Sequence, residues 1–291
     1  MRTQTTLKYI AVASVCAALL VSGAAAAVAA TTRVDLRRGD TVNVHCASDK
    51  LSASRQSDTH VRLSCRAVST SSTSFATLPV GSTLPSDSTC ASRVRRSSWE
   101  PRPDNTTANN TVPSSVSIPA WGGVDSRWNT QIMPRVTGNF TGTTDEIIQW
   151  AACKWGFDED IVRAVAVGES SWRMSQLGDY TSNPDKCAPG YSVPCPTSFG
   201  SMQVKWTQHP GTYPLSKQST AFNIDYTLAA RRGCFEGYET WLSMYGDYRA
   251  GDEWGCIGRW YSGRWHDTAA DDYISRRKAD LADRAWASPG F

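Results

Sequence analysis

The chain has 291 residues, of which 40% are hydrophobic and 20% are charged, so it is long enough to bury a medium domain together with a smaller one. Its formal net charge is only +3 at pH 7. A charge this small gives no global field that would attract a polyanion, and we therefore expect no nucleic-acid partner.

Residues 1–30 have the pattern of an export signal. A basic start at Arg2 and Lys8 precedes a long apolar stretch that ends in small residues. This order predicts a signal peptide that is cleaved after Ala29 or Ala30. The alternative is an uncleaved anchor, because the apolar stretch is long enough to span a bilayer. In both cases the rest of the chain leaves the cytoplasm, and we expect a secreted protein.

The cysteines support an extracytoplasmic location. Nine are present, and eight remain once Cys16 is removed with the signal. An even number in an exported chain, without any Cys-x-x-Cys spacing, favours disulfides over metal ligation. We therefore expect no metal ion and no cofactor. Short sequence separations nominate the pairs Cys46–Cys65, Cys187–Cys195 and Cys234–Cys256, which leaves Cys90 for Cys153.

Two segments of different composition precede the C-terminal half. Residues 31–68 alternate between apolar and polar side chains, as short strands do, and predict a small β module that is pinned by a disulfide. Residues 69–140 are rich in Ser, Thr, Pro and Asn and predict a linker or an extended wrap. The excess of Lys and Arg over residues 31–120 would allow contact with anionic wall polymers, although a solvated surface explains it better.

Residues 141–291 have a helical pattern. Thr143 and Glu146 have the spacing of a capping box, and the helix that they start should stop at Gly156. Asp158 and its acidic neighbours favour the start of a second helix, because negative charge is stabilised at a helix N-terminus. Further helices are predicted over 220–232, with a stop at Gly233, and over 238–245 and 269–287.

Glu169 is the first candidate for a catalytic acid. It continues an apolar stripe of the second helix that includes Val162 and Ala166. Burial of an unpaired carboxylate is costly and raises its pKa, which suits the group to donate a proton near neutral pH. The alternative is a structural glutamate that caps a neighbouring backbone.

Two motifs give this candidate a context. Gly-Glu-Ser-Ser-Trp at 168–172 and Ser-Phe-Gly-Ser-Met-Gln at 198–203 resemble the first two motifs of lysozyme-like lytic transglycosylases and their goose-type lysozyme relatives. The resemblance covers roughly residues 140–280. It implies an α+β fold class, in which a mostly helical lysozyme-like catalytic domain over 141–291 is preceded by the small disulfide-pinned β module.

The resemblance also assigns roles to residues. It implies that Glu169 is the only catalytic acid and that Ser170 helps to orient the site. The second motif would line the sugar groove. Ser201 stands where the family usually has Leu, and the third motif of the family is replaced by Trp-Tyr-Ser-Gly at 260–263. The density of Gly and aromatic residues over 260–265 is awkward for a helix interior, so we expect this run outside a helix. The substrate-binding residues implied by these motifs are Ser170, Ser198, Gly200, Met202, Gln203 and Tyr261.

The implied reaction is cleavage of peptidoglycan glycan strands between N-acetylmuramic acid and N-acetylglucosamine. The resemblance also implies a bacterial protein that is secreted or associated with the cell wall. Glycoside cleavage usually employs two carboxyl groups, whereas lytic transglycosylases manage with one. Asp179 is a second candidate carboxylate, and its alternative role is that of a turn residue after Gly178. The loop over 178–196, closed by its own disulfide, is expected to form one wall of a cleft. The rival function is a secreted wall-binding or adhesion protein whose groove binds without cutting.

Overall fold

The computed structural model describes residues 76–291 completely, and before them it describes the backbone of residues 10–11, 31–35, 41–42, 51–55 and 60–65. The chain divides into two compact units, residues 1–73 and 74–291. Each unit is described by itself.

The first unit contains a three-stranded antiparallel sheet over the residues predicted to form a β module. Its strands are β2 (Thr31–Asp35), β4 (Leu51–Arg55) and β5 (His60–Cys65), in the order β2-β5-β4. Two further short strands, β1 (Ile10–Ala11) and β3 (Thr41–Val42), pair in parallel. Cys46 and most of residues 1–30 lie outside the described residues, so the Cys46–Cys65 bond and the signal peptide stay predictions.

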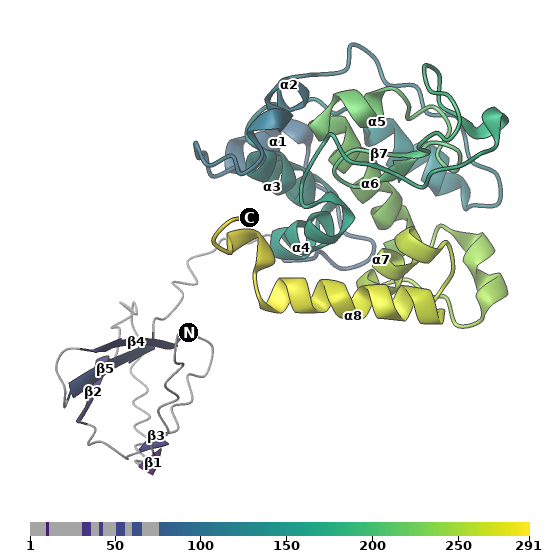
Figure 1. Ribbon diagram of the computed structural model, residues 1–291. Coiled ribbons are helices and arrows are strands. Elements are labelled where there is room, and N and C mark those ends of the chain that lie inside the picture. Colours follow the sequence, from purple (N-terminus) through teal and green to yellow (C-terminus); the bar gives the residue numbers. More distant parts are fainter. Residues whose placement is uncertain (1–9, 12–30, 36–40, 43–50, 56–59, 66–75) are drawn as a thin grey trace. The chain divides into compact units, whose positions relative to one another are not determined.

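The second unit is mostly helical, as the sequence predicts. Its helices are α1 (Asp87–Arg93), α2 (Thr106–Asn109), α3 (Thr144–Trp155), α4 (Glu159–Ser170), α5 (Leu215–Gln218), α6 (Thr220–Phe235), α7 (Glu253–Ser262) and α8 (Thr268–Ala282). The strands β6 (Leu177–Gly178), β7 (Ser198–Phe199) and β8 (Val204–Lys205) form a small antiparallel sheet between α4 and α5 in the sequence. Helices α4 and α7 both lie along α8 (Figure 1). Among the described residues, no helix combines the length and apolar character needed to cross a membrane.

The starts of α3 and α4 confirm the capping signals. The side-chain oxygen of Thr143 accepts the amide of Glu146 at 3.3 Å, and the Glu146 carboxylate accepts the Thr143 amide at 3.0 Å. The Asp158 carboxylate accepts the amide of Asp160 at 2.8 Å at the start of α4. Each cap satisfies amides that have no partner within the helix. Helix α3 ends at Trp155, immediately before Gly156.

Two other helix predictions need correction. Helix α6 does not stop at Gly233 but continues to Phe235. A side-chain carbon at position 233 would overlap the indole of Trp128, so this glycine allows a close approach rather than ending the helix. The α-helix expected over 238–245 is instead a 3-10 segment over Thr240–Tyr245.

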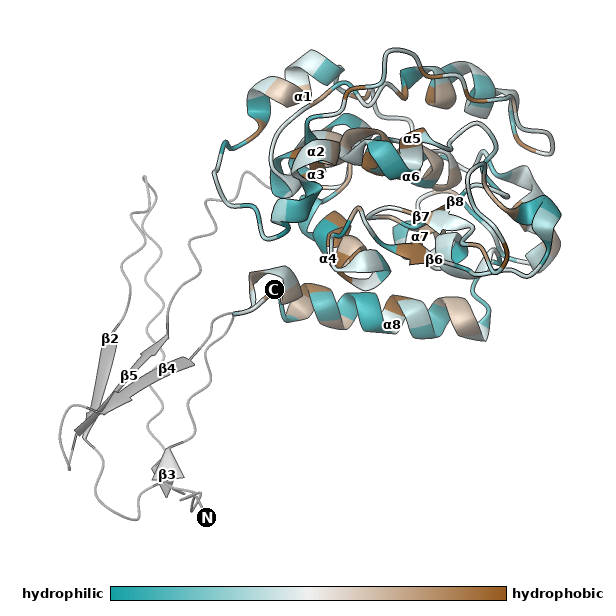
Figure 2. Ribbon diagram, turned by 45° about the horizontal axis from the view of Figure 1, so that its top comes forward, coloured by the Kyte–Doolittle hydropathy of each residue, from teal (hydrophilic) through white to brown (hydrophobic). Residues whose placement is uncertain are grey.

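The core of the second unit is built from large aromatic side chains around α3 and α6. Its largest fully buried apolar members include Trp128, Trp150, Trp155, Trp172, Phe157, Phe199 and Phe222. Trp128 and the buried Phe140 come from the segment that precedes α3, so residues 76–140 contribute to this core. Helix α8 lies at the surface and is largely hydrophilic in Figure 2, with its buried residues confined to one stripe.

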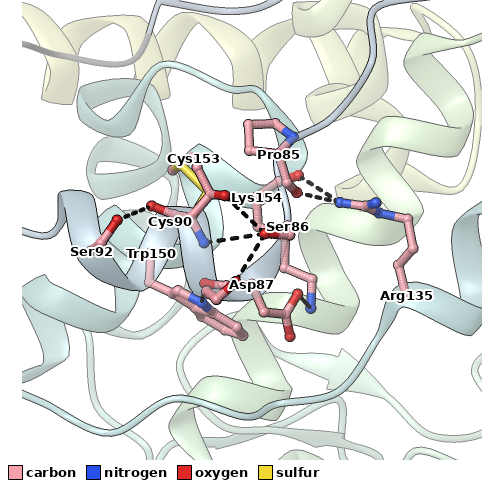
Figure 3. The surroundings of a disulfide bond; sticks show 11 residues. Pro85, Ser86, Asp87, Cys90, Ser92, Arg135, Trp150, Cys153 and Lys154 are labelled. Carbon is pink, nitrogen blue, oxygen red and sulfur yellow. Dashed lines mark hydrogen bonds and ion pairs between the residues drawn. A yellow bond between two sulfur atoms is a disulfide. The ribbon is translucent and has the colours of Figure 1, made fainter.

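Three of the predicted disulfides are confirmed, namely Cys90–Cys153, Cys187–Cys195 and Cys234–Cys256. Figure 3 shows the first of them, which joins α1 to α3. Beside it the Lys154 ammonium lies 3.0 Å from the Asp87 carboxylate and 2.8 Å from the buried Asp225 carboxylate, so its buried charge is paired. Disulfides persist in oxidising compartments, and three of them support an extracytoplasmic protein.

Candidate active site

Glu169 lies in the last turn of α4, where the chain turns sharply away from the helix. Ser171 and Trp172 follow with positive φ angles of 51° and 65°. The buried indole of Trp172 donates to the carbonyl of Arg163 at 3.1 Å, which fixes this turn against α4. The Tyr273 hydroxyl, from α8, donates a hydrogen bond to the Glu169 carboxylate. Glu169 is therefore held between the end of one helix and the side of another.

The surroundings of Glu169 make it a weak acid. Burial raises its pKa to about 7. The hydrogen bond from Tyr273 and the positive charges of Arg277 and Arg231 oppose this rise, whereas the negative charge of Asp179 adds to it. A carboxyl group with this pKa is present in both its protonated and ionised forms near neutral pH. It can therefore donate a proton and later accept one.

Ser170 connects α4 to the second motif. Its hydroxyl donates to the Ser201 carbonyl at 2.8 Å, in the run 198–203. That run is in turn anchored to α6 by Asn223. The Asn223 side-chain oxygen accepts the Met202 amide at 2.8 Å, and its side-chain nitrogen donates to the Phe199 carbonyl at 2.9 Å. The two motifs that lie 26 residues apart are thus joined through hydrogen bonds to the backbone.

Within the second motif, the residues differ in exposure. Ser198 and Met202 are buried, and the Met202 carbonyl accepts the indole hydrogen of Trp260 at 3.1 Å. Gly200 has a φ of 79°, and a side-chain carbon there would collide with the Asn223 amide, so only glycine fits. The partly buried Gln203 donates to the Gly200 carbonyl at 2.8 Å. This motif forms a rigid wall whose polar groups are mostly satisfied internally.

Asp179 directly follows β6 and has a φ of 51°. Its carboxylate accepts the Ser198 hydroxyl at 2.6 Å and pairs with the Lys205 ammonium at 3.1 Å. Burial alone would raise the pKa of Asp179, but the hydrogen bonds from Ser198 and Lys205 outweigh burial and hold that pKa below its usual value. Asp179 is therefore ionised at neutral pH, and it acts on the pKa of Glu169 through its charge.

A hollow of about 610 Å³ lies beside Asp179. Residues 179–181 and 185–186, which precede the Cys187–Cys195 bond, line one side of it, and residues from the end of β8 onward line another. Its lining includes Tyr180, whose surface is 62% exposed, and the indole of Trp206. Exposed aromatic rings beside polar groups are suited to pack against carbohydrate rings.

Tyr261 is linked to Glu169 through Tyr273, and its environment corrects one expectation. The sequence around it was expected to avoid a helix, yet α7 extends through Tyr261 to Ser262. Gly258 allows α7 to approach α8, since a side-chain carbon there would lie 2.8 Å from Ile274. Gly258 therefore serves helix packing, whereas Gly263, with a φ of 72°, follows the end of α7. The half-exposed Tyr261 ring stacks on Tyr273, with 4.5 Å between the ring centroids and an angle of 9°.

Sequence reasoning missed the residues that set the acidity of Glu169. Tyr273 and Arg277 lie four residues apart on the buried stripe of α8, and Arg231 is buried on α6. A tyrosine on an amphipathic stripe is most often a core residue, so its spacing carries no functional signal. Asn223 gave a weak signal, as an amide between Phe222 and Ile224 in a helical run. Among residues 76–291, no cluster of three His, Cys, Asp or Glu side chains is arranged to hold a metal ion.

Comparisons of this chain with protein-family models, with curated proteins and with solved structures find no match. The geometry around Glu169 and the resemblance of its two motifs are therefore the features that bear on function.

Proposed function

We propose that this protein cleaves the glycosidic bond between N-acetylmuramic acid and N-acetylglucosamine in peptidoglycan, as a lytic transglycosylase or muramidase with a lysozyme-like fold. The observation that carries the proposal is the placement of Glu169, which accepts a hydrogen bond from Tyr273 and whose neighbour Ser170 contacts the second motif. A second carboxyl group, Asp179, has a pKa shift in the opposite direction. Glu169 has its pKa raised to about 7, and Asp179 has its pKa lowered. Glycoside cleavage requires one carboxyl group that can donate a proton and favours a second that stays ionised beside the positive charge that develops on the sugar.

In the first step, protonated Glu169 gives its proton to the bridging oxygen while the bond from that oxygen to the anomeric carbon breaks. Positive charge develops on the ring, and the Asp179 carboxylate stabilises it. In the second step, the Glu169 carboxylate accepts a proton. If the proton comes from the C6 hydroxyl of the same sugar, that oxygen bonds to the anomeric carbon and a 1,6-anhydro product forms. If it comes from water, the product is a reducing sugar.

Other features are consistent with a substrate outside the cytoplasm. The export signal and the disulfides favour a secreted or wall-associated protein, and peptidoglycan glycan strands are found there. Tyr180 and Tyr261 present exposed aromatic faces that suit sugar rings. The basic residues over 31–120 are proposed to contact anionic wall polymers.

The test is digestion of purified peptidoglycan by the mature protein, with mass analysis of the released muropeptides. Anhydro and reducing products differ in mass, so one experiment establishes cleavage and its outcome. Glu169→Gln preserves the shape of the side chain but removes the proton, and it should lower the rate by about a thousandfold. Asp272→Asn, which neutralises an exposed carboxylate of α8, is the matched control and should cleave at the parental rate.

Digestion at the parental rate by Glu169→Gln would show that another group is the acid. Binding of the parental protein to walls without release of any muropeptide would instead favour the rival function, a secreted wall-binding or adhesion protein.

A further inference from the structure

Arg277 occupies a slot on the surface of α4 that exists because residue 168 is glycine. Arg277 belongs to α8 and is only 8% exposed. A side-chain carbon on Gly168 would overlap the Arg277 guanidinium, so these two groups are in direct contact. Gly168 is the neighbour of Glu169 in the chain. The guanidinium therefore lies against the backbone that carries the candidate acid.

Two other contacts fix the orientation of this guanidinium. Its Nε and Nη2 atoms donate to the Asp280 carboxylate at 2.8 and 2.6 Å, one turn further along α8. Its central carbon lies 4.9 Å from the centroid of the Tyr273 ring, within the range of a cation–π contact. Tyr273 in turn donates to the Glu169 carboxylate. A continuous series of contacts thus runs from Asp280 through Arg277 and Tyr273 to Glu169.

We propose that Arg277 is a positioning residue for Glu169, whose guanidinium in the Gly168 slot holds the Tyr273 hydroxyl on the acid and adds a positive charge that favours the ionised carboxylate. The catalytic consequence of this assignment rests on the proposed function. The placement itself depends only on the contacts among α4, α8 and Glu169.

Other charged groups also face Glu169. Arg231 on α6 adds a second positive charge, and its buried terminal nitrogens have no hydrogen-bond partner. Asp179, after β6, adds a negative charge. Arg277 differs from both because it also contacts Tyr273, the hydrogen-bond donor to Glu169. Its loss should therefore change both the charge beside the acid and the orientation of its donor.

The direction of the effect follows from the charge. Burial raises the pKa of Glu169, and the positive charge of Arg277 opposes that rise. Without Arg277 the pKa should therefore be higher, and Glu169 should stay protonated to a higher pH. Proton donation would persist further into the alkaline range, whereas the ionised form needed for the second step would be scarcer at neutral pH. Under the proposed function, the alkaline limb of the pH–rate profile should move upward while kcat at neutral pH falls.

The experiment titrates Glu169 directly in the full-length mature protein, by NMR of protein labelled with ¹³C at the glutamate carboxyl groups. The Glu169→Gln spectrum assigns the signal. Arg277→Met should raise the pKa of Glu169 by about one unit, whereas Arg277→Lys retains the charge and should restore most of the parental value. Gly168→Ala fills the slot and should shift the pKa in the same direction as Arg277→Met.

Two further variants make the result specific. Lys278→Gln removes a positive charge from an exposed position of α8 and should leave the titration unchanged. The double variant Gly168→Ala with Arg277→Met should add little to Arg277→Met alone, because both changes remove the same contact.

The proposal would be overturned if Glu169 had the same pKa in folded Arg277→Met as in the parental protein. If that variant does not fold, a parental titration in folded Gly168→Ala would overturn it instead. The titration contains no substrate, so it remains decisive even if the parental protein digests no walls. In that case the proposed function fails and the assignment of Arg277 is judged separately.

Discussion

The two sides of Glu169 are built in different ways. On one side, the run 198–203 is held by hydrogen bonds between Asn223, Ser170 and backbone groups. On the other side, Tyr273 of α8 donates to Glu169, and its ring contacts Arg277 of α8 and Tyr261 of α7. The first side is held by hydrogen bonds to the backbone, and the second contributes side chains that lower the pKa of the carboxyl group. The residues that form a recognisable motif are thus largely the ones that shape the site.

The largest effect is expected for Asn223→Ala, on the motif side. This change removes a fully buried amide and leaves the Phe199 carbonyl and the Met202 amide without their partners. The free energy of unfolding should fall by about 3 kcal/mol, since each unpaired buried polar group is costly. Denaturant unfolding followed by circular dichroism measures it.

The control for Asn223→Ala is Asn110→Ala, whose exposed side chain donates to a carbonyl of its own short helix. It should change stability by well under 1 kcal/mol. Equal losses in the two variants would contradict the assigned anchoring role of Asn223.

Asp179→Asn should produce the next largest effect. Asparagine preserves the size of the side chain but removes the negative charge, so the developing positive charge on the sugar is no longer stabilised. We expect a decrease in kcat of about a hundredfold. Removal of the same charge should lower the pKa of Glu169 and shift the alkaline limb of the pH–rate profile downward. If kcat falls but the alkaline limb of the pH–rate profile does not shift, the charge of Asp179 does not act on the pKa of Glu169.

Tyr273→Phe, on the α8 side, should shift the same limb in the opposite direction. The hydrogen bond from Tyr273 lowers the pKa of Glu169, so its loss should raise that pKa. The ring still stacks on Tyr261, and stability should change little. We expect a decrease in kcat of about tenfold, because one hydrogen bond to a charged group is lost. Limbs that move in the same direction in Tyr273→Phe and Asp179→Asn would contradict the opposite effects of these two groups on the pKa of Glu169.

The parts of the fold that could be predicted are those specified by local chemistry. The capping box at Thr143 and Glu146 depends on neighbouring residues, and so does the cap at Asp158. The three disulfides confirmed in the described part of the chain include the distant pair Cys90–Cys153, which was found because the other cysteines had nearer partners.

The parts that could not be predicted depend on contacts between distant segments. Gly233 was expected to end a helix, but its function is to accept the Trp128 ring from another segment. Tyr261 was expected outside a helix because of the Gly and aromatic residues around it. It lies in α7, where Gly258 allows close packing against α8. Tyr273 and Glu169 are 104 residues apart, and no local pattern distinguishes this tyrosine from an ordinary core residue. Glu169 could be predicted as the acid from the apolar stripe of its helix and from its motif. The residues that surround it could be identified only from the folded structure.

The smallest effect is expected at His266, which joins the start of α7 to the start of α8. Its ring nitrogens lie 2.7 Å from the Asp271 carboxylate and 3.0 Å from the Asp252 carboxylate. Partial burial alone would lower the pKa of His266, but the two carboxylates outweigh burial and raise it above its usual value. The stabilisation from protonated His266 is therefore fully present below about pH 6.5 and is lost as the pH rises through the raised pKa.

His266→Gln should remove this dependence on pH. Because the ring is partly exposed and solvent screens its charge, we expect a loss of only about 0.5 kcal/mol at pH 6 and a smaller loss at pH 9. Glu169 also titrates near neutral pH and changes stability in the same direction, so the measurement is the difference between the parental and variant unfolding curves at each pH. A difference that is constant with pH would show that His266 contributes packing to the α7–α8 connection but no charge.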